Sequence, residues 1–111
     1  MMKMDTRKAR QRITFLLPPE GTDDDGFPRK EWTPYVTVWA ELQTLKGKSF
    51  YEAASTNLEN YRHFRIRYRN DLNDRMRVSW NDIDHELAAP IENTDGMNRF
   101  MDVRVKAVTN R

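Results

Sequence analysis

The sequence predicts a mainly β protein, a small antiparallel β-barrel or sandwich of about six strands with one short helix inserted between central strands. Polar and apolar side chains alternate along several segments, most regularly over 61–69, and such alternation is typical of half-buried strands. Turn-forming residues separate these segments at short intervals. Long helical patterns do not alternate with the strands, as a parallel sheet would require.

The length of the chain, 111 residues, predicts one domain. We expect a flexible N-terminal arm over 1–9, a single domain over 10–108 and a tail over 109–111. The absence of cysteine excludes disulfides and thiol chemistry. No apolar run approaches the length of a membrane span, and the basic N-terminus lacks the apolar core of a signal peptide.

The first strand is expected over 10–17, where apolar residues occur at alternate positions until Pro18-Pro19 ends the pattern. Residues 18–27 predict a loop, because they contain proline, glycine and an Asp-Gly pair. Three consecutive aspartates in this loop indicate a solvated tip, since the spaced ligands of a calcium loop are missing. A short strand is expected over 28–32.

A stronger strand is expected over 35–43, because apolar residues lie on both of its faces. A strand with one wet face would not need Trp39, so this strand is either central or covered on its outer face. Over 49–58, a capping box at Ser49 and apolar residues at helical spacing predict the short helix.

The stretch 61–69 has the clearest strand pattern. Its apolar face carries Phe64, Ile66 and Tyr68, and its opposite face carries His63, Arg65, Arg67 and Arg69. The first set predicts contact with the core. The second set predicts a basic face that meets solvent or an acidic partner.

The last third of the chain predicts a hairpin and a closing strand. Strands over 76–80 and 83–87 flank Asn81-Asp82, two residues that tolerate positive φ, so a tight two-residue turn is expected. Residues 90–97 predict a loop, and the alternating residues 98–108 predict the closing strand.

No catalytic constellation is visible in the sequence. His85 lies between Asp84 and Glu86, but neighbours on a strand face opposite sides, so a shared site is not expected and His85 is interpreted as an edge-strand residue. His63 is expected to be exposed. Without a phosphate loop, nucleophile motif or paired histidines, we predict no enzyme, no catalytic or metal-ligating residue and no cofactor.

The basic face of 61–69 is also a candidate nucleic-acid surface. Single-strand binders carry aromatic rings on the same face as the positive charge, whereas Phe64 and Tyr68 lie opposite the arginines. Phosphate contact alone stays open, but a solvated or subunit-contacting face is favoured. The three tryptophans are interpreted as core or interface anchors: Trp32, Trp39 and Trp80.

Several pieces occur in a recognisable order: RQRITFLLP, an acidic glycine-containing loop, EWTPYVTVWAELQTLKGKSFYEA, HFRIRYRNDLNDRMRVSW and NRFMDVRVKAV. The most specific is the strand VWAEL followed by a glycine and an aromatic–Glu–Ala helix start. Over 10–108 this order resembles the phage head–tail joining family, the small head-closure or stopper proteins of long-tailed bacteriophages. The chain departs from the family pattern at 6–9, where Gly and Leu are frequent, and at Asn81-Asp82, where Asp-Gly is common.

The resemblance implies a small β-barrel with a helix-bearing insertion, whose copies form a homo-oligomeric ring beneath the portal or adaptor of a DNA-filled capsid. Such a ring closes the DNA channel, contacts packaged double-stranded DNA transiently and offers a docking face to tail proteins. It implies a virion location in the neck, after synthesis in the bacterial host cytoplasm, with no membrane, enzyme activity or cofactor.

Two sets of residues are candidates for this role. A ring needs a heterologous interface, and the basic face of 61–69 could meet the acidic segments 20–25 and 82–95 of a neighbour. The candidate interface residues are Arg65, Arg67, Arg69, Asp23, Asp24 and Asp25. The segment 43–57 is the candidate channel gate or an ordinary connection across a barrel end, and its DNA-proximal residues would be Lys46, Gly47, Lys48 and Ser49.

Two other functions stay open. One is a tail-side joining ring similar to a tail terminator, and the other is a free-standing nucleic-acid-binding small β-barrel. A salt-dependent shift of short DNA by the isolated protein would favour the second.

Overall fold

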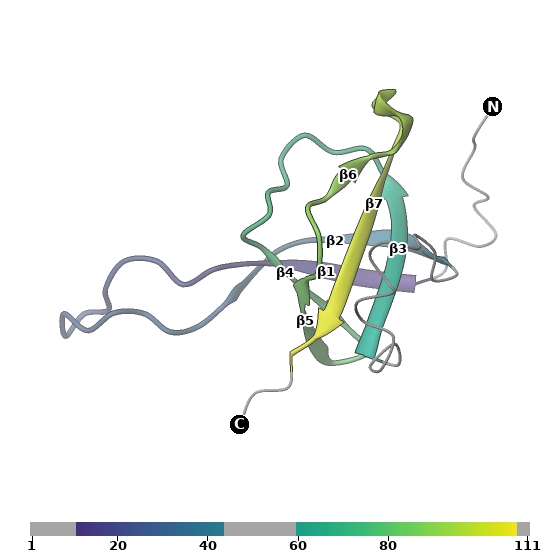
Figure 1. Ribbon diagram of the computed structural model, residues 1–111. Coiled ribbons are helices and arrows are strands. Elements are labelled where there is room, and N and C mark those ends of the chain that lie inside the picture. Colours follow the sequence, from purple (N-terminus) through teal and green to yellow (C-terminus); the bar gives the residue numbers. More distant parts are fainter. Residues whose placement is uncertain (1–10, 44–59, 109–111) are drawn as a thin grey trace.

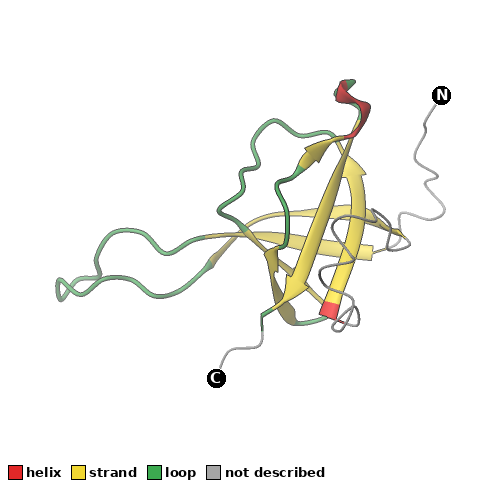
Figure 2. Cartoon of the chain, in the orientation of Figure 1, coloured by secondary structure: helices red, strands yellow, loops and turns green. Residues whose placement is uncertain are grey.

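A computed structural model describes residues 11–43 and 60–108. These residues form seven strands and a short 3-10 turn (Figure 1): β1 (Gln11–Leu17), β2 (Thr33–Gln43), β3 (Tyr61–Arg67), β4 (Arg77–Trp80), β5 (Ile83–Leu87), β6 (Glu92–Asn93), η2 (Thr94–Gly96) and β7 (Phe100–Ala107). Strands and loops make up nearly all of this region (Figure 2), and no helix in it is long and apolar enough to cross a membrane. The expected helix over 49–58 and both chain ends lie outside the described residues.

Six of the strands close into an antiparallel barrel. The order is β3-β2-β1-β4-β5-β7, and β3 also pairs with β7 to complete the ring of strands. β6 is an additional strand that pairs with β7 at Asp102 and Met101, beyond the part of β7 that pairs with β5. The predicted fold class is therefore confirmed, with a barrel rather than a sandwich.

The core of the barrel consists of the apolar faces that alternation predicts. In β1, β3 and β7 the residues of the buried cluster occupy alternate positions, and each fully buried large apolar side chain contributes about 2 kcal/mol relative to an exposed one. The buried cluster contains Ile13, Phe15, Ala40, Phe64, Ile66, Met76, Val78, Met101, Val103 and Val105. The assignment of 61–69 as a strand with its apolar face inward is thus confirmed over β3.

The hairpin between β4 and β5 also matches expectation. Trp80 pairs with Ile83, and the two residues between them have positive φ, 54° at Asn81 and 63° at Asp82. These are the backbone angles of a type I′ turn, whose twist fits the flanking strands.

A β-bulge interrupts the pairing of β1 and β2 near the end of β1. Phe15 pairs with Val36 whereas Leu16 pairs with Pro34, so Tyr35 is the extra residue in β2. Beyond the bulge the chain continues as a long connection over 18–32, which we call the β1–β2 arm. The arm projects away from the barrel (Figure 1), and the molecule accordingly measures 53 × 32 × 24 Å.

The short strand expected over 28–32 is wrong. In this segment the structure has only an isolated bridge between Thr22 and Pro28. Pro28 has no N–H to donate to a ladder, and the charged residues that follow it stay exposed. The strand over 35–43 was expected to be central or covered on its outer face, and the first alternative holds, because β2 lies between β1 and β3. Its outer face is nevertheless exposed at Trp39.

Candidate interaction surfaces

The tip of the β1–β2 arm is an ordered turn built around Asp23. Its carboxylate Oδ1 accepts hydrogen bonds from the N–H groups of Asp25 at 2.9 Å and Phe27 at 3.0 Å. The backbone N–H of Asp23 donates to the Phe27 carbonyl at 2.8 Å, and the N–H of Gly26 donates to the Asp23 carbonyl at 3.0 Å. Gly26 has φ 84°, a conformation that favours glycine.

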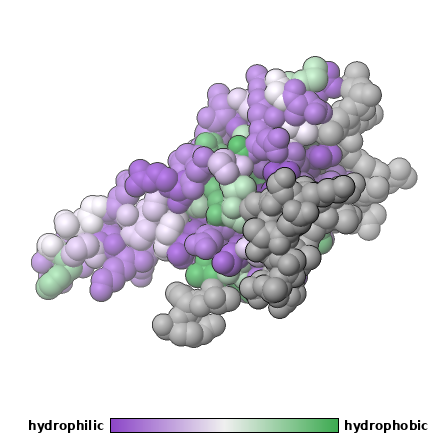
Figure 3. All heavy atoms as spheres, in the orientation of Figure 1, coloured by the Kyte–Doolittle hydropathy of each residue, from purple (hydrophilic) through white to green (hydrophobic). Residues whose placement is uncertain are grey.

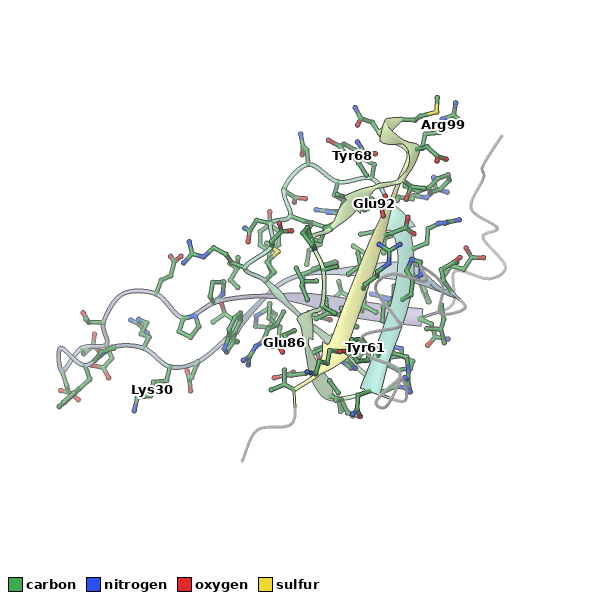
Figure 4. The ribbon with its side chains drawn as sticks, viewed as in Figure 1. Lys30, Tyr61, Tyr68, Glu86, Glu92 and Arg99 are labelled. Atoms are coloured by element: carbon green, nitrogen blue, oxygen red, sulfur yellow. The ribbon has the colours of Figure 1, made fainter. Side chains whose placement is uncertain are left out.

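This turn presents an aromatic ring to solvent. Phe27 is 66% exposed, and Asp24 and Asp25 beside it are also exposed. The surface of the arm is mostly hydrophilic but has a hydrophobic region at its far end (Figure 3). Lys30 lies on the arm, far from Glu92 and Arg99 at the η2 end of the barrel (Figure 4). The arm is therefore an acidic projection with one apolar group at its tip.

The arginines predicted to form one basic face have different environments. Arg65 lies opposite Asp102 on β7, and its Nε donates to Oδ1 at 3.3 Å. Arg69 makes a bidentate ion pair with Asp71, with distances of 3.0 Å from Nε and 2.8 Å from Nη2. Arg67 is exposed, and no ion pair within 11–43 and 60–108 involves it. Only part of the predicted face is thus free to meet a partner.

Asp102 is the centre of a buried polar network. It is 5% exposed, and its Oδ1 accepts a hydrogen bond from His63 Nε2 at 2.9 Å while Oδ2 accepts one from Thr94 Oγ1 at 2.7 Å. Burial raises the pKa of Asp102, but these two hydrogen bonds and the charge of Arg65 outweigh burial and lower the pKa to about 2. The network joins β3, β7 and the η2 turn.

The expectation that His63 is exposed is wrong. The side chain is 6% exposed and sits on Asp102, and its Nδ1 is buried without a hydrogen-bond partner within the described ranges. The sequence did not reveal this contact because Asp102 lies 39 residues away, and only the pairing of β3 with β7 brings the two together.

The assignment of His85 to an edge strand is also wrong, since β5 pairs with both β4 and β7. His85 is buried, its Nδ1–H donates to the Ile83 carbonyl at 2.9 Å, and burial lowers the pKa of its imidazole. Asp84 and Glu86 are exposed on the other face. The prediction that these three residues do not share a site is confirmed.

The outer surface of β1 and β2 carries a second group of aromatic and basic side chains. Arg12 pairs in register with Trp39, and its guanidinium lies 4.6 Å from the ring centroid. Next to this pair, the hydroxyls of Thr14 and Thr37 are hydrogen-bonded at 2.8 Å. Trp39 is 53% exposed. We call this surface the β1–β2 outer face, and it consists of Arg12, Thr14, Tyr35, Thr37 and Trp39.

Tyr35 lies at the edge of the β1–β2 outer face and contacts the chain after β3. Its hydroxyl donates to Asp71 Oδ2 at 2.8 Å, and this bond raises the pKa of Tyr35. Hydrogen bonds from Arg69 and Tyr35 lower the pKa of Asp71 to about 2. Asp71 therefore stays ionised and fixes both of its partners.

The other two tryptophans contribute to the barrel wall. Trp80 packs edge-on against Phe64 at 5.3 Å, and its Nε1–H donates to Gln11 at 3.0 Å. Trp32 at the base of the arm lies under the guanidinium of Arg77 at 4.3 Å. Only Trp39 has the exposure of an interface anchor.

The predicted site residues fall into three places. Asp23, Asp24 and Asp25 lie at the arm tip, the arginines lie on or just after β3, and no ion pair in the described part of the chain joins the two sets. The gate residues over 46–49 lie outside the described residues. Sequence reasoning missed Phe27; the available signal was its position beside Asp-Gly in a predicted loop, since loops run over the protein surface.

Several solved structures resemble this fold. The solution structure of protein SF1141 from Shigella flexneri 2a has a TM-score of 0.72 and 21% identity, covering 97% of this chain and 100% of that one. A chain from the virion of a native gene transfer agent particle has a TM-score of 0.59 and 10% identity, covering 91% of this chain and 96% of that one. No curated protein matches the chain. At these identities the likeness concerns the fold.

The sequence match is more specific. A family model described as phage head completion protein matches residues 4–108, almost the whole chain. This range includes the arm, all seven strands and the segment that contains the candidate gate. The chain therefore belongs to the phage head completion protein family and is a structural protein of the phage head or neck.

Proposed function

We propose that the protein forms a homo-oligomeric ring at the neck of the virion, between the portal or adaptor above and tail proteins below, where it closes the DNA channel of the filled head. The observation that carries the proposal is the family match over residues 4–108. The gene transfer agent neighbour supports it, since that barrel comes from an assembled virion.

The shape of the molecule suits assembly. A closed barrel has few free strand edges for pairing, so contacts between copies depend on projecting groups. The β1–β2 arm is such a projection, and it carries exposed carboxylates and an exposed phenylalanine. A heterologous ring interface needs two different patches that face each other on successive copies, and the acidic arm tip supplies one of them.

The exposed part of the basic face is one candidate for the second patch. On this candidate arrangement, which follows from the sequence, Arg65, Arg67 and Arg69 would meet Asp23, Asp24 and Asp25 of a neighbour, and Arg67 is the most accessible of the three. Arg65 and Arg69 would contact the neighbour while they keep their ion pairs with Asp102 and Asp71. Because exposed ion pairs are weak singly, these contacts would set orientation more than affinity.

The channel gate remains a proposal based on the sequence. Lys46 and Lys48 would touch DNA phosphates without a large basic footprint, and Gly47 would act as a hinge next to Ser49. A strongly basic channel would hold DNA, because each neutralised phosphate releases counterions and tightens binding. The net charge of only +2 suits passage of the genome.

The decisive experiment adds the purified protein to DNA-filled, tailless heads. We expect the heads to gain a ring below the portal and to retain their genome, as seen by electron microscopy and nuclease protection. Heads that bind no protein would contradict the proposal. If the heads bind no protein and the isolated protein instead shifts short DNA in a salt-dependent way, the result would favour a free-standing nucleic-acid-binding barrel.

The gate is tested on the same heads with a variant that lacks residues 46–49. We expect this variant to fold and to form the ring but to release DNA, because the segment that narrows the channel is shorter. Circular dichroism checks the fold, and nuclease sensitivity measures the release. Rings of the variant that keep the DNA protected would show that the segment is an ordinary connection.

A further inference from the structure

The β1–β2 outer face exposes an aromatic ring beside a charged side chain. Trp39 is 53% exposed, although tryptophan has a large apolar surface and usually finds cover in a core or an interface. Arg12 lies over its ring, and within the described residues no carboxylate pairs with this guanidinium. The face thus offers an apolar ring edge beside a positive charge.

The arm tip has the complementary chemistry. Phe27 is 66% exposed, and the neighbouring residues Asp24 and Asp25 bear negative charge. Hydrogen bonds to Asp23 hold the turn in one conformation in the free protein, so little ordering entropy would be lost on docking. An aromatic group beside negative charge therefore matches an aromatic group beside positive charge.

The arm tip and the outer face of one copy lie far apart in this structure. Phe27 and Trp39 are twelve residues apart, both in the part of the hairpin that leads from the arm tip into β2. An extended chain of that length spans about 40 Å. The pairing of β1 with β2 keeps the hairpin extended as far as Leu17 and Thr33. Contact between these two surfaces therefore requires two molecules.

We propose that the arm tip of one copy docks on the β1–β2 outer face of the next copy, with Phe27 against Trp39 and Asp24 and Asp25 toward Arg12. This contact joins two different patches, so it can repeat from copy to copy, and it forms a ring where the rotation between successive copies closes. The inference rests on the proposed ring and specifies its interface. It assigns the main acceptor of the arm to Arg12 and Trp39 rather than to Arg65, Arg67 and Arg69. Of these three arginines, Arg65 and Arg69 already pair with carboxylates.

Cysteine cross-linking tests the contact directly, because the chain has no cysteine of its own. One variant combines Asp24→Cys with Thr37→Cys, which lies beside Trp39 on the outer face. The matched control combines Asp24→Cys with Arg67→Cys. Both are assembled on DNA-filled heads, oxidised and separated on a non-reducing gel. We expect a ladder of covalent oligomers from the first variant and at most dimers from the control or from any single-cysteine variant.

Charge reversal provides a second measurement. Arg12→Glu should lower the amount of ring on heads by about tenfold or more, since a like charge would face the arm tip. Reversing the tip with Asp24→Arg and Asp25→Arg in the same chain should restore the ring. Restoration would support the contact, and a double variant as defective as Arg12→Glu alone would overturn it.

The outcomes separate this inference from the function on which it rests. The docking proposal would be overturned if rings form on heads but the ladder comes only from the control pair or from neither pair. The proposed ring would then still stand. Unmodified protein that forms no ring on heads would overturn the proposed function itself.

Discussion

Among single residues, Asp102 has the environment least like that of an ordinary strand aspartate. Its carboxylate is buried, and a buried charge is costly unless it is paired and hydrogen-bonded. His63 and Thr94 donate to it, and Arg65 supplies the opposite charge. Thr94 begins the η2 turn, where Asp95 has φ 58°. The network therefore fixes a turn with an unfavourable backbone angle to the barrel.

This arrangement predicts a loss of stability in acid. The pKa of Asp102 is about 2 in the folded protein against an ordinary value of 3.8. A lowered pKa stabilises the fold above the ordinary value, here by about 2 kcal/mol, and this contribution disappears as the pH falls from about 4 toward 2. Asp102→Asn should flatten the pH dependence of the free energy of unfolding in that window, measured by urea denaturation.

Asp71→Asn is the matched control, because the pKa of Asp71 is also about 2. The Asp71 side chain is 32% exposed, so water screens its ion pair and its contribution should be smaller. At pH 7, Asp102→Asn should cost about 3 kcal/mol, since it leaves buried donors poorly paired. An Asp102→Asn protein with the same slope between pH 4 and 2 as the parent would contradict this account.

The surroundings of Asp102 also show what the sequence alone could not predict. Alternation correctly placed His63 and Arg65 on the face opposite Phe64, but it could not identify what that face meets. The answer depends on the register of β3 against β7, in which Arg65 lies opposite Asp102. Cross-strand partners come from distant parts of the chain. Alternation alone therefore predicted that His63 and Arg65 face solvent or a partner molecule, whereas His63 is buried and Arg65 is half-buried.

Among the elements, the β4–β5 hairpin is the one whose local sequence determines its geometry. Asn81 and Asp82 both have positive φ, which costs an ordinary L-residue about 1–2 kcal/mol. Asn and Asp tolerate this region better than other non-glycine residues because their short side chains bond locally. The turn was therefore predictable from two residues.

The turn gives a direct test by substitution. Asp82→Val should lower the free energy of unfolding by about 1–2 kcal/mol relative to Asp82→Gly, because a β-branched residue is strained at φ 63° whereas glycine is not. Chemical denaturation measures the difference. The control is Asp84→Val, an exposed position two residues along in extended β5, where valine should be neutral or stabilising. Equal losses at both positions would contradict a role for the backbone angle.

Other elements depend on context that no local pattern contains. The segment 28–32 was expected as a strand, but it lies in an arm that pairs with itself only at Thr22 and Pro28. The bulge at Tyr35 changes which residues of β1 and β2 face each other beyond Phe15. Nothing in the alternation of β2 marks this insertion, since Tyr35 also fits the pattern of an unbroken strand.

Across the described molecule, the barrel and the arm differ in burial: the core lies in the barrel, and most of the arm is exposed. All of the buried core residues belong to the barrel strands or, in the case of Met76, to the residue before β4. Every residue over 20–31 is exposed. The barrel therefore accounts for stability, and the arm has no contribution to the core. The fold and the family were predictable from the order of segments, whereas this division between barrel and arm required the structure.

This division predicts that the arm can be shortened without loss of the fold. Replacing residues 20–30 by Asn-Gly keeps Trp32 under Arg77 and leaves the pair of Leu17 and Thr33 to close a six-residue loop. A loop shortened from fifteen residues to six costs about 1 kcal/mol less to close, so thermal stability should be unchanged or slightly raised. Scanning calorimetry measures this.

The same variant should not assemble on DNA-filled heads, because it lacks the patch that reaches the next copy. The matched control is Phe27→Ser, which keeps the arm and its Asp23 turn but removes the exposed ring, and its assembly should be intermediate because the acidic residues remain. A shortened protein that unfolds would mean that the arm supports the barrel. A shortened protein that forms normal rings would assign the contact between copies to the barrel itself, and the exposed Phe27 would then belong to the contact with the ring above or below.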